Sequence, residues 1–488
     1  MNVFRLFRLA WLAILLAPFA LAQQPFVAGT WTQVAKAPPL PVGHALLLTD
    51  GSVLINGYYP YAHSDPWYRL IPDSTGSYVK GTWVKAGTLP TGYNPLYFAS
   101  QVLPSGQVVI FGGEYNNGNA VWTTLGALYT PATNQWTALS APLLWSSIGD
   151  AQSILLPSGK MMLANCCTTD EAILTLTNGA ANWTPTGAGK ADPNDEESWT
   201  MLPGNQILTV NAYADGGCCA KGFQIYTPST GKWTTPAGNT VANLVDSKSS
   251  EIGPLALLPN GTVFAAGGTP NNALYTVSTG TWAKAPGFGN GLDVADGPAA
   301  VLPNGNLLLD TSPGVYNNGS VFFEWDGKVL HRTTAPQNAA LDPSYAGDML
   351  VLPTGQILFT DMSSLVQIYD PAGSPCAGCA PTIVSVSSTL THGSVNNAIK
   401  GTQFTGLTQG AYYGDDNQSY TNYPLVRITD ATGHVVFCRT HNWQPSVATG
   451  TKIVPAQFDV PAKIALGPAK LEVVVNGIAS TPVAVTIM

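Results

Sequence analysis

Charged side chains are scarce in this sequence. Asp, Glu, Lys and Arg make up 10% of its 488 residues, against about 25% in an average soluble protein. Lys and Arg number 20 against 28 Asp and Glu, and the net charge of −8 leaves no basic surface of the kind that nucleic-acid-binding proteins carry. The one long apolar run lies at the N-terminus. We therefore expect no nucleic-acid partner, and no membrane association once that run is removed.

The N-terminal run has the pattern of a secretory signal peptide. Arg5 and Arg8 precede the apolar stretch Leu9–Leu21, and small residues flank Leu21 before Gln23. Residues 1–22 are therefore predicted to be cleaved from a secreted or periplasmic protein. The seven cysteines fit such an oxidising compartment.

A turn phrase recurs along most of the chain. Leu155–Gly159 reads Leu-Leu-Pro-Ser-Gly, with β-prone residues on both sides. Proline presets φ for the first corner of a tight turn, and Gly or Asn accepts the positive φ of the second. Each copy therefore predicts a β-hairpin. Related phrases begin at Leu48, Leu103, Leu202, Leu258, Leu302 and Leu352.

A second phrase completes each repeat. Leu128–Trp136 predicts a strand, a turn and a strand that begins near Trp, and similar phrases end at Trp233 and Trp282. A repeat of roughly 50 residues with this content is typical of a four-stranded propeller blade. The seventh repeat lacks its Trp strand, which we expect 29–34 to supply from the other end of the chain. We predict an all-β fold in which 27–379 form a seven-bladed β-propeller.

The repeat stops near Pro381. Short apolar segments separated by Pro, Gly and Asn predict an immunoglobulin-like β-sandwich over 381–488. A long polar excursion, Gly406–Tyr423, has the length to reach the propeller.

These features together resemble a known family. The diglycines Gly112-Gly113 and Gly267-Gly268, the Tyr/Trp phrases and the C-terminal sandwich are similar to the kelch propeller of the galactose oxidase superfamily with its immunoglobulin-like domain. In that family a Tyr-His pair before the last Leu-Pro turn and a second His after a Tyr-Gly bind copper. Here the pairs read Tyr345-Ala346 and Tyr413-Gly414-Asp415. The resemblance therefore implies the fold without the copper-radical chemistry, and we expect no cofactor or metal.

The cysteines predict local cross-links. Cys376 and Cys379 are expected to form a clasp after the last blade, and Cys438 to remain free. Cys166-Cys167 and Cys218-Cys219 are vicinal pairs in equivalent loops of the third and fourth blades. Each pair could close on itself, or the two loops could be bridged.

Function is expected on the face that carries the longer loops, because aromatic and acidic residues gather in them. Aromatic rings stack on the C–H faces of sugars, and carboxylates accept hydrogen bonds from hydroxyls. Predicted ligand-binding residues are Tyr59, Tyr61, Trp67, Tyr115, Trp145, Trp199 and Tyr345. Candidate catalytic carboxylates are Asp150, Glu196, Glu197 and Glu251.

Two functions fit these loops. The first is binding of an extracellular carbohydrate or other polymer without chemistry. The second is a polysaccharide hydrolase or lyase that uses paired carboxylates. Carboxylates that converge and are partly buried would favour the second, and splayed, solvated ones the first. Calcium binding by the acidic loops is left open.

Overall fold

The structure is a computed structural model that describes residues 26–58, 66–214, 217–218 and 221–488. The predicted signal peptide, Tyr59, Tyr61, Cys219 and the side chain of Cys218 lie outside the description. No helix of the described chain has the length and apolar character needed to cross a membrane.

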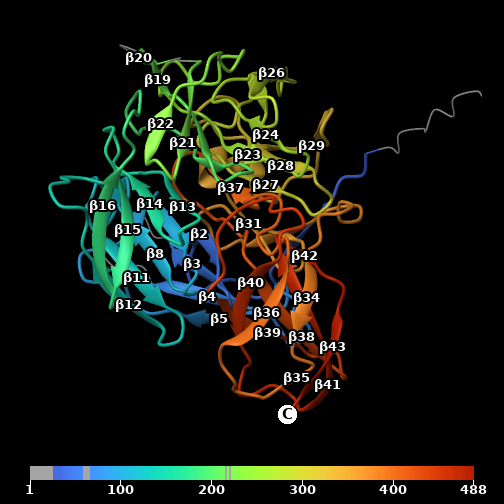
Figure 1. The fold of residues 1–488 in the computed structure, drawn as a ribbon. Helices are drawn as coiled ribbons and strands as arrows, with labels where there is room; N and C mark the ends of the chain where they lie inside the picture. The colour runs from blue at the N-terminus through green and yellow to red at the C-terminus, as the bar shows by residue number, and fades with distance from the viewer. Residues whose placement is uncertain (1–25, 59–65, 215–216, 219–220) are drawn as a thin grey trace, which may run out of the picture.

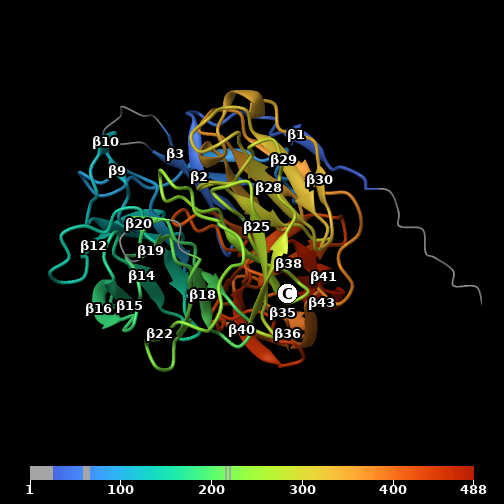
Figure 2. The ribbon, with the colours of Figure 1, turned by 90° about the horizontal axis from the view of Figure 1, so that it is seen from above.

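Within the described residues, seven antiparallel sheets follow one another in chain order around a ring (Figures 1 and 2). The predicted all-β propeller is confirmed. Blades one to three consist of β2 (Val42–Leu47), β3 (Val53–Gly57), β4 (Trp67–Ile71) and β5 (Thr82–Lys85); β7 (Ala99–Val102), β8 (Val108–Phe111), β11 (Gly126–Thr130) and β12 (Gln135–Leu139); and β13 (Ser153–Leu155), β14 (Met161–Ala164), β15 (Glu171–Thr177) and β16 (Ala180–Thr186).

The remaining blades continue in the same way. Their strands are β17 (Thr200–Met201), β18 (Ile207–Val210), β21 (Phe223–Thr227) and β22 (Lys232–Thr234); β23 (Leu255–Leu257), β24 (Thr262–Ala265), β25 (Asn272–Thr276) and β26 (Thr281–Ala285); β27 (Ala299–Val301), β28 (Leu307–Thr311), β29 (Val321–Trp325) and β30 (Leu330–Arg332); and β31 (Asp348–Val351), β32 (Ile357–Thr360), β33 (Gln367–Asp370) and β1 (Thr30–Gln33). Smaller elements in the links are β6 (Pro95–Leu96), β9 (Tyr115–Asn116), β10 (Asn119–Ala120), β19 (Tyr213–Ala214), β20 (Gly217–Cys218) and the 3₁₀ helices η1 (Ala339–Leu341) and η2 (Ser344–Ala346).

The ring closes as the repeat count predicted. β1 pairs antiparallel with β33, and Trp31 stands opposite Tyr369. Because the first and last segments share one blade, neither leaves an open sheet edge at the joint. The Leu-Pro turns form the predicted hairpins: the Gly159 amide donates to the Leu156 carbonyl at 2.8 Å, with φ of 78° at Gly159.

In several blades the Trp of the outer strand packs on an aromatic side chain of the preceding blade. The Trp136 ring centroid lies 4.9 Å from that of Trp67, and Trp183 meets Phe111 at 5.0 Å. Trp282 repeats the contact with Phe223 at 5.5 Å. The repeated Trp is therefore a spacer between blades, and burial of these large rings stabilises the ring as a whole.

The strands after the propeller form one continuous curled sheet. They are β34 (Thr382–Val386), β35 (Thr389–Leu390), β36 (Asn397–Thr402), β38 (Leu425–Asp430), β39 (Val435–His441), β40 (Val454–Asp459), β41 (Gly467–Val475), β42 (Ile478–Ala479) and β43 (Val483–Ile487). β39 joins the two halves, because its start pairs with β38 and its end with β40. This orange-to-red sheet lies to one side of the ring (Figure 1).

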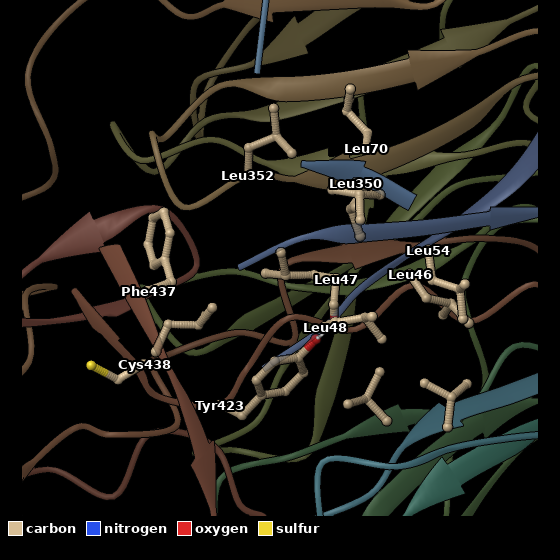
Figure 3. Packing of buried hydrophobic residues seen from close by; sticks show 14 of the residues in the cluster. Leu46, Leu47, Leu48, Leu54, Leu70, Leu350, Leu352, Tyr423, Phe437 and Cys438 are labelled. Carbon is tan, nitrogen blue, oxygen red and sulfur yellow. Dashed lines mark hydrogen bonds between the residues drawn. The ribbon is translucent and has the colours of Figure 1, made fainter. Parts of the chain in front are cut away.

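Its core is continuous with that of the first and last blades. Figure 3 shows Phe437 and Tyr423 among leucines of β2, β3 and the Leu352 turn. The Tyr423 hydroxyl donates to the Leu47 carbonyl. A side chain at Gly51 would collide with the Phe437 ring, so this glycine permits the close approach. Cys438 is buried here as the free cysteine that was predicted.

The polar excursion enters the centre of the propeller, as its length suggested. β37 (Ala411–Tyr412) adds a strand to β27, and we call residues 409–420 the axial segment. Its groups bond to the inner strands on several sides. The Met201 amide donates to Gln409 at 2.8 Å, and the Ser419 hydroxyl donates to the Met349 carbonyl at 2.8 Å. The C-terminal domain thus fills the centre of the ring with its own chain.

Candidate functional site

Several links between blades turn sharply just before the inner strand. Tyr97, Glu196, Ser250 and Asp296 each have positive φ, between 49° and 70°. This left-handed conformation is unfavourable for residues other than glycine, and costs of about 1–3 kcal/mol are tolerated mainly where the surroundings fix the geometry. The turns bring acidic and aromatic side chains to the starts of the inner strands.

Carboxylates converge there. We define the axial acid cluster as the side chains that raise one another's pKa at this end of the ring: Glu114, Asp150, Glu196, Glu251, Asp296, Asp415 and Asp416. Asp415 and Asp416 come from the axial segment, and the others from blade links and a loop of the second blade. Sequence analysis named three members as catalytic candidates, namely Asp150, Glu196 and Glu251.

Two members of the axial acid cluster, Glu196 and Glu251, contact each other. Burial, followed by the charge of Glu251, raises the pKa of Glu196 well above its ordinary value, and the two side chains are hydrogen-bonded. The same bond acts in the opposite direction on Glu251, where it lowers the pKa against the larger effect of burial. The Tyr316 hydroxyl donates to Glu251, at 2.6 Å. Glu251 thus contacts both Glu196 and the tyrosine rim.

The floor of the site is buried and unpaired. Asp415 and Asp416 are 3% and 1% exposed. Burial and neighbouring carboxylates raise both of their pKa values well above the ordinary range. One oxygen of each side chain has no hydrogen-bond partner among the described residues, and the same holds for one oxygen of Asp150 and of Asp296. Unsatisfied buried oxygens of this kind are rare and call for a ligand, an ion or water.

The rim is more open and aromatic. Tyr115, Tyr316 and Tyr345 are partly or well exposed, whereas Tyr97 is buried between them. The ring centroid of Tyr97 lies 6.3 Å from that of Tyr115 and 6.5 Å from that of Tyr345. The centroids of Tyr345 and Tyr316 are 5.6 Å apart. Glu114 stands beside Tyr115, and burial raises its pKa to about 7. The site therefore combines a row of tyrosines with a floor of carboxyl groups.

Glu197 is not part of this site, which corrects its assignment as a catalytic candidate. It is fully buried and accepts a hydrogen bond from the Lys190 ammonium at 2.9 Å and from the Thr209 hydroxyl at 3.0 Å. Lys190 also bonds to Asp192 at 3.0 Å. Glu197 therefore belongs to an internal ion pair.

Two predicted stacking residues are also corrected. Trp67 is 1% exposed and lies against Trp136, and Trp199 is 3% exposed and lies against Trp233. Both rings are covered by other side chains, so neither is free to stack on a ligand. Trp145 is half-buried against the same core as Trp199. Tyr115 and Tyr345 lie at the axial acid cluster, and their role in binding stays a prediction.

The cross-links agree with the local alternative. Cys166 is bonded to its neighbour Cys167, and Cys376 to Cys379. The Cys166 sulfur lies 3.7 Å from an oxygen of Asp195. The vicinal bridge therefore stands next to the link that carries Glu196. The pairing of Cys218 and Cys219 lies outside the described residues.

A serine–histidine–aspartate arrangement occurs near the centre of the ring. His44 Nδ1 lies 2.5 Å from Asp348 Oδ2, and His44 Nε2 lies 2.9 Å from Ser100 Oγ. Ser100 has no exposed surface and donates to the Gln418 carbonyl at 2.9 Å. A nucleophile must reach its substrate, so we assign this group to holding the axial segment in place rather than to catalysis.

Comparison with known proteins extends the description of the fold. No established sequence family matches the chain, and no curated protein does so. The structure is similar to a fungal alcohol oxidase of the AA5 family solved in complex with copper, with a TM-score of 0.54 and 15% identity over 95% of this chain and 100% of that one. At this identity the similarity concerns the fold alone, a β-propeller followed by a further β domain.

More distant similarities are to the extracellular domain of a putative hybrid two component system, BT4673 from B. thetaiotaomicron, and to YCF48 bound to D1 peptide. The first has a TM-score of 0.47 and 11% identity over 94% of this chain and 59% of that one. The second has a TM-score of 0.47 and 12% identity over 72% of this chain and 98% of that one.

The residues at the axial acid cluster do not fit copper. Ala346 and Asp415 stand where the sequence resemblance would require histidines. His44 has both ring nitrogens engaged by Asp348 and Ser100. Carboxylate oxygens suit hard cations, whereas copper is typically held by imidazole. We derive no oxidase step for this chain.

Sequence reasoning missed part of the site. Tyr97 and Tyr316 were not singled out, and Asp415 and Asp416 were noted only as part of an excursion that could reach the propeller. Tyr345 and Glu251 were predicted because they lie in the links that precede inner strands. The same position identifies Tyr97, since it stands two residues before β7.

Proposed function

We propose that this chain is an exported protein that binds a carbohydrate at the axial acid cluster and its tyrosine rim. The observation that carries the proposal is the placement of partly exposed Tyr115, Tyr316 and Tyr345 beside converging carboxyl groups. Sugar rings present C–H faces that stack on aromatic rings, and their hydroxyls donate to carboxylates. A rigid link between blades also lowers the ordering entropy that binding would cost.

A binding screen tests this proposal. The mature chain, beginning at Gln23, is applied to a glycan array, and hits are measured by calorimetry. We expect Tyr345→Ala to weaken a hit by about tenfold, in line with loss of a stacking contact worth about 1 kcal/mol or more. Ser158→Ala, in a hairpin turn between β13 and β14, is the matched control and should leave the affinity unchanged. Equal loss in both variants, or none in either, contradicts the placement of the site.

A second candidate is a polysaccharide hydrolase or lyase. It is favoured by the raised pKa of Glu196 and by the pKa of about 7 for Glu114, since a carboxyl group that is still protonated near neutrality can act as a general acid. Glu196 and Glu251 are too close together to flank a glycosidic bond as glycosidase carboxylates do. Glu114 is therefore the acid that this alternative requires.

Release of reducing ends distinguishes the two candidates. A panel of neutral and acidic polysaccharides is incubated with the mature chain between pH 5 and 8. Turnover that is lost in Glu114→Gln, with glycan affinity retained, supports the enzyme. Glycan binding without turnover across the panel supports the binding protein.

A further inference from the structure

The structure shows no ion pair between the axial acid cluster and any cationic side chain of residues 26–58, 66–214, 217–218 and 221–488. Lys190, which belongs to the neighbouring blade link, is committed to Glu197 and Asp192. Buried charges in proteins are ordinarily paired. A ligand that carries a positive charge would therefore find no competing cation among the described residues at this site.

The spacing of the oxygens bears on the kind of cation. Among the described residues, only Cys166, Cys167 and Asp195 place three metal-compatible atoms within 4.8 Å of one another. A calcium ion needs six to eight oxygens at about 2.3–2.6 Å. No three described side chains of the axial acid cluster bring ligand oxygens that close together, which favours an organic cation over a calcium ion.

The tyrosine rim indicates which kind of organic cation fits the site. Tyr316 is 57% exposed, and its hydroxyl is already bound to Glu251. Its ring stands at 75° to that of Tyr345, with 5.6 Å between the centroids. A ring face of this kind attracts an ammonium group and also stacks on a pyranose. A ligand that carries both groups would use the rim and the floor together.

We infer that the ligand is an amino sugar with a free ammonium group, held by the unpaired oxygens of Asp415 and Asp416 while its ring lies on the tyrosine rim. Both carboxylates are more than nine-tenths buried, and Asp415 Oδ2 and Asp416 Oδ1 have no partner among the described residues. An ammonium donates three hydrogen bonds and supplies a positive charge. This inference rests on the proposed carbohydrate function and names the class of sugar.

Calorimetry with matched oligosaccharides tests it. The probes are tetramers of glucosamine, of N-acetylglucosamine and of glucose, with calcium chloride and a lysine-containing peptide as further probes. We expect the glucosamine tetramer to bind at least about tenfold more tightly than the other two sugars, and its affinity to fall when salt is raised from about 50 to 500 mM. Asp416→Asn should weaken it by about tenfold or more.

Two variants guard against misfolding and against a general charge effect. Asp296→Asn removes a carboxylate of the same cluster from a different element and should also weaken binding. Asp370→Asn removes an exposed carboxylate at the end of β33 and should not. Circular dichroism and thermal melting confirm that each variant is folded.

The outcomes separate this inference from the proposed function. If the three sugars bind equally and Asp416→Asn has no effect, the amino-sugar assignment fails while carbohydrate binding stands. If no sugar binds, but calcium or the peptide does and Asp416→Asn weakens it, both are overturned.

Discussion

Glu196 and Glu197 are adjacent in the chain, yet they belong to opposite kinds of site. Glu197 is fully buried and neutralised by Lys190 at 2.9 Å. Glu196 turns through a positive φ of 56° into the axial acid cluster, where its neighbours are other carboxyl groups. Burial lowers the pKa of Lys190, but the charges of Glu197 and Asp192 outweigh that effect and raise it. Glu197 therefore belongs to an internal ion pair, whereas Glu196 lies among carboxyl groups at the proposed ligand site.

The largest expected loss of stability comes from breaking the ion pair of Glu197 with Lys190. Lys190→Met leaves Glu197 and Asp192 buried without a cation, and removal of one partner of a buried pair costs about 3–5 kcal/mol. Calorimetric melting should show a large fall in Tm. Lys160→Met, at an exposed position, is the control and should change Tm little. If both variants melt alike, the ion pair contributes little to the junction.

The aromatic residues divide in the same way. Trp199 is buried against Trp233, so Trp199→Ala should cost about 3 kcal/mol through the cavity that it leaves. Its indole nitrogen has no hydrogen-bond partner among the described residues, so no bond is lost. Tyr345→Ala, at the partly exposed rim, should change Tm by much less. Urea unfolding of the two variants compares them, and equal losses would contradict the division.

Glu171 is a buried carboxyl group with a neutral hydrogen-bond donor in place of a cation. Glu171 is buried and accepts only the indole N–H of Trp233, at 2.7 Å, and burial raises its pKa from 4.5 to about 8. A raised folded-state pKa contributes stability that is present below the unfolded value and is lost as the pH rises through the folded value. Tm should therefore fall by about 2–4 °C or more between pH 6 and 9. Glu171→Gln should flatten this slope, and an unchanged slope would assign it to other groups.

The smallest change in stability should come from Glu196, which has no cationic partner among the described residues. Glu196→Gln keeps a hydrogen-bond donor toward Glu251 and removes a group that repels it when ionised. We expect stability to stay within about 1 kcal/mol of the natural chain or to rise slightly. Glu197→Gln, one position along, weakens the pair with Lys190 and should be clearly destabilising. Melting curves of the two variants side by side measure the contrast, and matching losses would remove it.

The repeat pattern was sufficient for the architecture, because hairpin turns and outer-strand tryptophans are local signals. It also predicted the pairing of the strand at Trp31 with that at Tyr369, since only one repeat lacked a strand. The site depended on side-chain direction, which composition does not contain. Nothing in the run Glu196-Glu197 indicates which residue meets Lys190, and the aromatic character of Trp67 and Trp199 suits a blade junction as well as a ligand.

The pairing of β1 with β33, which closes the ring, affects the timing of folding. Gly29 and Tyr369, which bond across this joint, are separated by 340 residues. At synthesis rates of about 5–20 residues per second, β1 leaves the ribosome roughly twenty seconds to a minute before its partner exists. Throughout that interval its backbone has no strand to pair with. A nascent chain that stops before residue 367 contains the strands of every earlier blade but lacks β33, the partner of β1. The ring can therefore close only after the last blade has been translated.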